Sequence, residues 1–103
     1  MSVQIITKAN FEDLVLKSEK PVLLDFWAPW CAPCRMVGPV VEAIAAERQD
    51  ITVGKINVDE EMELAMSFKV TSIPMLVVMK GGKISEKTVG YCDKAEIEAL
   101  LEA

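Results

Sequence analysis

One short segment limits the fold of this chain more than any other. Residues 21–27 read Pro-Val-Leu-Leu-Asp-Phe-Trp and are apolar at both alternating positions except at Asp25. A strand that is apolar on both faces is covered on both sides, which is typical of the middle of a sheet that lies between layers of helices. The segment therefore predicts a central strand with one carboxylate on a covered face.

The rest of the chain alternates between strand and helix patterns. Short β-branched or alternating runs predict strands, and apolar residues at helical spacing predict helices between them. We expect Asn10, Asp59 and Asp93 to cap helices, the last in a capping box with Glu96. The predicted strands are residues 3–6, 21–27, 51–57, 75–79 and 84–89, and the predicted helices begin after Asn10, run from 33 to about 49, run from 59 to about 68, and begin after Asp93. The fold class is therefore α/β with a mixed sheet.

Two details refine this order of elements. Pro39 lies inside the long helix and removes one backbone donor, but the apolar stripe continues in phase beyond it, so we expect a bend and no break. The adjacent glycines Gly81 and Gly82 can supply the positive φ angles of a two-residue turn. The last two strands are therefore predicted to be antiparallel neighbours.

Composition narrows the class of protein. The chain has 103 residues, 51% of them hydrophobic, which suffices for a core without cross-links and predicts a single domain over residues 1–103. It contains no histidine, which excludes His-based catalysis and Cys₂His₂ zinc sites, and its net charge of −5 opposes binding to nucleic acid or anionic membranes. Without an apolar leader or a membrane-length apolar run, we expect a cytoplasmic protein.

The residues expected to be chemically reactive come directly after the central strand. Residues 30–34, Trp-Cys-Ala-Pro-Cys, lead into the long helix, and Pro33 suits its first turn because the missing N–H has no helical partner there. Cys31 then lies at the helix N-terminus, where free N–H groups and the helix dipole favour a thiolate. The sequence predicts Cys31 as the nucleophile. Cys34, one turn further and less exposed, lies close to disulfide geometry with it.

The same spacing has a second interpretation. A C-x-x-C pair is also half of a zinc site, and Cys92 is the only other cysteine that could join it. A pair that follows a strand and opens a helix is instead typical of redox proteins. Cys92 is either a buried, inert thiol or a resolving or regulatory thiol close to the active site.

The chain resembles the thioredoxin family over its whole length. The Trp-Cys-Ala-Pro-Cys motif is similar to that of the family, which usually has glycine at the position of Ala32. Further matches are Asp25-Phe26-Trp27-Ala28-Pro29, Pro39, Lys55, Ile73-Pro74, Gly82 and Gly90. The resemblance implies a central five-stranded mixed sheet flanked by four helices. It also implies a protein-disulfide reductase that has no bound cofactor and works through the redox-active Cys31–Cys34 disulfide.

Asp25 acquires a role from this resemblance. Burial on a covered strand should raise its pKa, and the family pattern implies that it accepts and donates a proton for Cys34 while Lys55 modulates it. The alternative is a buried carboxylate that only accepts backbone hydrogen bonds or pairs with Lys55.

The segment around Pro74 is implied to contact substrates. In this family the bond that corresponds to Ile73–Pro74 is cis, and the Ile73 backbone faces the cysteines, where it can pair with an extended chain. A trans proline at the start of a strand is the alternative. The contact surface implied by the family is Trp30, Val58, Ser72, Ile73, Val89, Gly90 and Tyr91. For Val58 and Val89, packing between strands is an equal alternative.

The implied cycle begins with attack of Cys31 on a substrate disulfide and ends when Cys34 releases the reduced substrate. Thioredoxin reductase then restores the dithiol, so the implied partners are this reductase and proteins that carry disulfides. The chain is expected to act as a monomer. Two other classes remain open, a metal-binding module built on Cys31, Cys34 and Cys92, and a non-catalytic interaction subunit.

Overall fold

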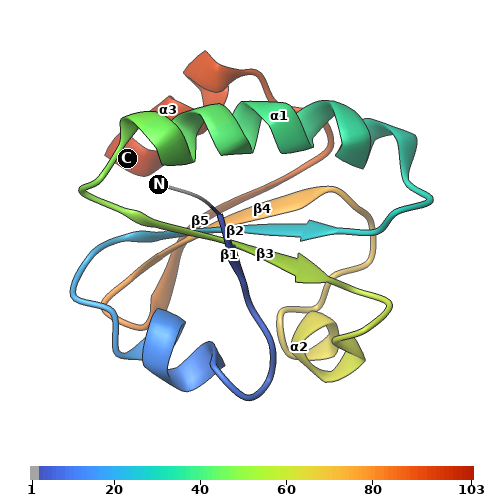
Figure 1. Cartoon of the computed structure of the whole chain (residues 1–103), viewed down its shortest axis with the longest axis horizontal. Coiled ribbons are helices and arrows are strands. Elements are labelled where there is room, and N and C mark those ends of the chain that lie inside the picture. Colours follow the sequence, from blue (N-terminus) through green and yellow to red (C-terminus); the bar gives the residue numbers. More distant parts are fainter. Residues whose placement is uncertain (1–2) are drawn as a thin grey trace.

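A computed structural model describes residues 3–103 of the chain. Figure 1 shows one twisted sheet between two layers of helices. Helices α1 (Ala32–Glu47) and α3 (Lys94–Glu102) cover one face, and η1 (Glu12–Leu16) and α2 (Met62–Ser67) cover the other. The α/β class predicted from the sequence, with a mixed sheet and four flanking helices, is confirmed.

The five strands follow the order β1-β3-β2-β4-β5 in a single sheet. The strands are β1 (Gln4–Ile5), β2 (Val22–Trp27), β3 (Thr52–Asn57), β4 (Met75–Lys80) and β5 (Lys83–Val89). Strands β1, β3 and β2 are parallel, whereas β4 and β5 each run antiparallel to their neighbours. Strand β2 occupies the middle of the sheet, as its two-sided apolar pattern predicts.

Alternation along β2 divides its side chains between two cores. Leu23 packs under α1 and α3, while Leu24 and Phe26 pack on the opposite face with residues of η1 and α2. All three are fully buried, and full burial of one such side chain contributes about 1.5–3 kcal/mol. Because side chains alternate, Asp25 lies on the same face as Leu23, beneath α1.

Helix α1 begins at Ala32 and continues through Pro39 to Glu47. Its apolar stripe is buried against the sheet through Val37, Val41 and Ile44. This packing holds the residues on both sides of Pro39 in one helix, although the proline donates no backbone hydrogen bond. The helix ends two residues before the predicted boundary near Gln49.

Two of the predicted helix caps are wrong. Asn10 Oδ1 accepts a hydrogen bond from the Thr7 N–H at 2.8 Å, and in the described part of the chain η1 has no side-chain cap. Asp59 Oδ2 accepts from Trp30 Nε1 at 2.9 Å, and α2 begins only at Met62. In each case the polar side chain has another partner, which competes with the capping interaction.

The hairpin turn and the last cap agree with the prediction. Gly81 and Gly82 both have positive φ, 60° and 79°, and they join β4 to β5. At the start of α3, Asp93 Oδ1 accepts from the Glu96 N–H at 2.8 Å, and Glu96 Oε1 accepts from the Asp93 N–H at 2.9 Å. This reciprocal pair is the expected capping box.

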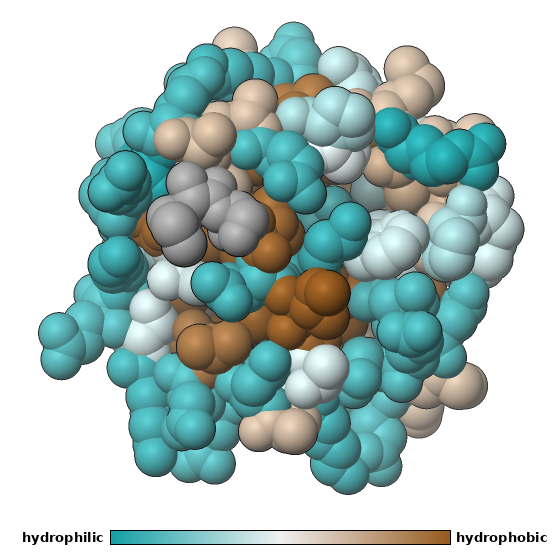
Figure 2. All heavy atoms as spheres, in the orientation of Figure 1, coloured by the Kyte–Doolittle hydropathy of each residue, from teal (hydrophilic) through white to brown (hydrophobic). Residues whose placement is uncertain are grey.

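The face of the molecule seen in Figure 2 is mostly hydrophilic. Figure 2 shows hydrophilic side chains over most of one face, with apolar ones gathered near its middle, over the edge strand β1. Ile5 in this strand is 71% exposed. Within residues 3–103, no helix combines the length and the apolar character that a membrane crossing requires.

The capping box gives a first prediction. Asp93→Ala removes the acceptor for the Glu96 N–H and should lower the free energy of unfolding by about 1 kcal/mol. Asp93→Asn keeps an acceptor oxygen and should lose less than half of that. Urea unfolding followed by circular dichroism measures both variants, and equal losses would show that the side-chain cap contributes nothing.

Candidate active site

The loop between β2 and α1 brings Cys31 and Cys34 together. A disulfide joins them, with their Cα atoms 5.2 Å apart. Cys31 is the N-cap residue of α1, in an extended conformation, and its Sγ accepts a hydrogen bond from the Cys34 N–H at 3.2 Å. In the reduced protein, this donor and the positive end of the helix dipole favour negative charge on Cys31 Sγ. Cys31 thus lies at the helix N-terminus, where the sequence predicts it.

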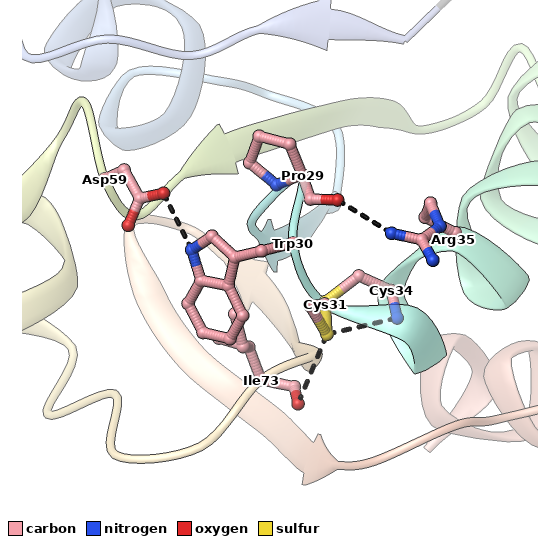
Figure 3. Close-up of a disulfide and its surroundings, with 7 residues drawn as sticks. All are labelled: Pro29, Trp30, Cys31, Cys34, Arg35, Asp59 and Ile73. Atoms are coloured by element: carbon pink, nitrogen blue, oxygen red, sulfur yellow. Dashed lines mark hydrogen bonds between the residues drawn. A yellow bond between two sulfur atoms is a disulfide. The ribbon is translucent and has the colours of Figure 1, made fainter.

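The exposure of the two cysteines differs from the expectation. Cys31 is 5% exposed and Cys34 is 4% exposed, so accessibility does not distinguish them in the disulfide state. The surroundings of the two sulfur atoms do distinguish them. Cys31 Sγ lies 3.8 Å from the carbonyl oxygen of Ile73, a residue outside α1 (Figure 3). A disulfide sulfur has no hydrogen to donate, so this approach is a van der Waals contact that a reduced thiol can convert into a hydrogen bond.

Two side chains on opposite sides of Cys31 hold the loop in place (Figure 3). Arg35 Nη1 donates to the Pro29 carbonyl at 3.0 Å, and Trp30 Nε1 donates to Asp59 Oδ2 at 2.9 Å. Trp30 remains 67% exposed, so its ring is oriented but open to a partner. Sequence reasoning missed this role of Asp59, since the residue lies 29 positions from Trp30 and no local pattern links the two.

Asp25 is the buried carboxylate of the site. It is 2% exposed, and its Oδ1 has no hydrogen-bond partner within residues 3–103. Burial raises the pKa of Asp25 from its ordinary value of 3.8 to about 6, against the opposing effect of the Lys55 charge. A carboxylate with this pKa can exchange a proton close to neutral pH.

Lys55 lies opposite Asp25 in the pairing of β2 with β3. Its Nζ sits over the Trp27 ring, 4.2 Å from the centroid, in a cation–π contact. None of the ion pairs found within residues 3–103 joins Lys55 to Asp25. A direct pair with Lys55, the structural alternative for Asp25, is therefore not present.

The predicted contact residues fall into two neighbouring groups. A groove of about 150 Å³ next to the disulfide is lined by Trp30, Val58, Ala65, Val70, Thr71, Ser72 and Ile73. Beyond it, the Ile73–Pro74 peptide is cis, and the Pro74 carbonyl accepts from the Gly90 N–H at 2.8 Å. Val89 and Tyr91, on either side of Gly90, are 57% and 48% exposed. Val58 also packs against the cysteine pair, so it belongs to the core and to the groove at once.

Cys92 lies apart from the redox pair. It is a free thiol buried in the core between α1 and α3, with Val37 and Ile97 in the same cluster. Its Sγ is 3.9 Å from Thr88 Oγ1. Among residues 3–103, no three side chains of the metal-binding types are gathered into one group. Burial agrees with the interpretation of Cys92 as an inert thiol.

A cysteine pair that forms a disulfide at a helix N-terminus, on an α/β sheet with a buried carboxylate behind it, defines a dithiol–disulfide oxidoreductase. The model of the family described as Thioredoxin matches residues 2–103. The chain belongs to the thioredoxin family, and it is a thiol–disulfide oxidoreductase.

Individual relatives agree with this assignment. The thioredoxin of Alicyclobacillus acidocaldarius is 46% identical over 97 residues, which cover 93% of this chain and 91% of the relative. The thioredoxin of Mycobacterium tuberculosis is 50% identical over 93 residues, or 89% and 80% of the two chains. The chain is also 48% identical over 93 residues to the bifunctional thioredoxin reductase/thioredoxin of Mycobacterium leprae, covering 89% of this chain and 20% of that protein.

The burial of Asp25 predicts a pH-dependent stability. The folded protein holds this proton up to about pH 6, whereas the unfolded chain releases it near the ordinary pKa of 3.8, so the free energy of unfolding falls as the pH rises from 3.8 to about 6 and stays low above that range. Asp25→Asn should therefore raise this free energy by about 3 kcal/mol well above pH 6 and by little below pH 3.8. Denaturant unfolding of the disulfide form under both conditions measures the difference.

The control for this prediction is Asp13→Asn, which changes an exposed acid that pairs with Lys17. It should have a small effect at either pH. If Asp25→Asn changed stability equally under both conditions, the pKa of Asp25 would not be raised in the folded protein.

Proposed function

We propose that this chain reduces disulfide bonds in other proteins, with Cys31 as the nucleophile and Cys34 as the resolving thiol. The observation that carries the proposal is the 3.2 Å hydrogen bond from the Cys34 N–H to Cys31 Sγ at the start of α1. This donor stabilises a thiolate on Cys31 and none on Cys34, so the two thiols differ in reactivity. Pro33 supports the arrangement by starting the helix between them.

In the first step, the Cys31 thiolate attacks one sulfur of a substrate disulfide. The new bond joins Cys31 to the substrate, the substrate disulfide breaks, and its other sulfur leaves as a thiolate that takes a proton. In the second step, Cys34 loses its proton and attacks Cys31 Sγ. The Cys31–Cys34 disulfide forms, the mixed disulfide breaks, and the second substrate sulfur leaves as a thiolate that takes a proton. Two electrons pass from the dithiol to the substrate.

Asp25 is proposed to accept the proton of Cys34 in the second step. It lies beneath α1, on the face of the sheet against which the helix buries Cys34. Its pKa of about 6 leaves it mostly ionised at neutral pH and therefore able to act as a base. Lys55 limits the rise in this pKa.

The substrate chain is proposed to lie along Ile73. The carbonyl of Ile73 is directed at Cys31 Sγ (Figure 3), and Pro74 follows Ile73 through a cis peptide bond. An extended substrate can pair with such a backbone as a short added strand. The contacts would come from Trp30, Val58, Ser72 and Ile73 on one side and from Val89, Gly90 and Tyr91 on the other.

The electron donor is proposed to be a thioredoxin reductase. The Mycobacterium leprae relative carries both names in one protein, which supports such a pairing.

We also propose that the chain works as a monomer in the cytoplasm. The edge strand β5 carries charged Lys83, Glu86 and Lys87, which oppose edge-to-edge pairing with a second copy. A small number of cysteines suits a reducing compartment.

A turbidity assay tests the proposed activity. With dithiothreitol as the electron donor, the protein should accelerate the precipitation of reduced insulin well above the rate with dithiothreitol alone. Cys31→Ser removes the nucleophile and should bring the rate to this background. A Cys31→Ser chain that kept its biological role in cells would instead favour the non-catalytic subunit.

The role of Asp25 predicts a selective defect. Asp25→Asn cannot accept a proton, so release of the mixed disulfide should slow by about 10–1,000-fold near neutral pH, within the range of general base catalysis or below it. Attack by Cys31 on the substrate should keep a rate close to that of the wild type. Rapid-quench trapping of the mixed disulfide separates the two steps, and release at the wild-type rate would exclude Asp25 as the base.

A further inference from the structure

The short helix α2 exposes two methionines beside the groove next to the disulfide. Met62 is 65% exposed and Met66 is 73% exposed, and their spacing of four residues places them side by side on the helix surface. Ala65, which lines the groove with Trp30 and Ile73, is their neighbour on the helix. Apolar surface therefore continues from the groove onto α2. We call Met62 and Met66 the methionine face.

Three acidic side chains of this segment are engaged elsewhere, and the fourth, Glu60, lines a separate groove beside Trp27 and Lys55. Glu61 Oε1 accepts from the Lys8 N–H at 3.0 Å, and Glu63 forms an ion pair with the Lys8 ammonium. Both contacts draw these carboxylates toward the segment that follows β1. Asp59 is held by Trp30 Nε1. The methionine face is thus left apolar in a chain with a net charge of −5, and exposed apolar surface of this kind marks interaction sites.

The reaction itself determines what can cover this surface. In the mixed disulfide, a substrate cysteine is bonded to Cys31, which brings the two Cα atoms within about 4.4–6.8 Å of each other. An extended chain advances about 3.3 Å per residue, so residues close to that cysteine must pass over the adjoining surface. The groove begins at Ile73, whose carbonyl oxygen is 3.8 Å from Cys31 Sγ. Ala65 belongs both to the groove and to α2, so a chain that leaves the groove past Ala65 runs onto the helix that exposes Met62 and Met66.

We propose that the methionine face is a substrate subsite that takes a large apolar side chain a few residues from the reactive cysteine of an extended polypeptide. The proposal rests on the proposed function and adds a selectivity to it. Methionine side chains are unbranched and polarisable, so they fit apolar partners of several shapes. Met62 and Met66 are specificity-determining residues in this scheme and take no part in the thiol chemistry.

Single-turnover kinetics with matched peptides tests the proposal. The pre-reduced protein is mixed with disulfide peptides that carry one phenylalanine at successive positions from the cysteine, or serine at all of them, and the second-order rate constant is measured from tryptophan fluorescence. The wild type should prefer phenylalanine at one position a few residues away. The double variant Met62→Gln/Met66→Gln should lose this preference, with a fall of about tenfold for that peptide.

Three controls make the result specific. Rates with the serine peptide and with a small aromatic disulfide should not change in the double variant. Met62→Leu/Met66→Leu should restore the preference, because it keeps the apolar surface. Met36→Gln replaces a methionine that is 63% exposed on α1, outside the methionine face, and should leave the preference intact.

The outcomes separate the proposal from the function on which it rests. If the double variant kept the wild-type preference, or if Met36→Gln abolished it equally, the methionine face would not be a subsite, although disulfide reduction would stand. If the wild-type protein reduced neither the peptides nor the small disulfide, the proposed function itself would fail.

Discussion

Burial of β2 on both faces is the constraint on which the rest of the structure depends. Leu23 on one face and Phe26 on the other hold the strand between two layers of helices. The chain therefore leaves the sheet only where β2 ends, after Trp27. Helix α1 starts five residues later and must return across the sheet to bury its own stripe. The thiol pair at its first turn is therefore held at the carboxyl edge of the parallel strands, where α/β proteins commonly place their active sites.

The same burial gives Asp25 two opposing effects. Removing a carboxylate from water, with no partner for Oδ1 among residues 3–103, disfavours its charged form and costs stability at neutral pH. It also brings the pKa to about 6, close to the pH at which a base must accept and return a proton. A better-paired carboxylate would stabilise the fold and be a weaker base. Such an exchange of stability for chemistry is common at active sites.

The surface around the disulfide is assembled from distant segments and kept open by local contacts. Arg35 and Asp59 hold the backbone and the indole of the loop before α1, which orients Trp30 without burying it. Lys8 binds the carboxylates of Glu61, which precedes α2, and of Glu63 in its first turn. These polar contacts remain near the surface, so their individual energies are small. Their effect is to determine which apolar side chains a partner meets.

The sequence by itself determined the features that depend on residues close to one another along the chain. The two-sided pattern of β2, the Gly81-Gly82 turn, the Asp93–Glu96 box and the position of Cys31 at a helix start all follow from local stereochemistry and periodicity. Only the tertiary structure decided the contacts between segments far apart in the chain. It placed Asp59 against Trp30, Lys55 opposite Asp25, and Cys92 in the core under α1. Packing of the whole chain selects these partners, because a polar or sulfur-bearing side chain is locally compatible with several of them.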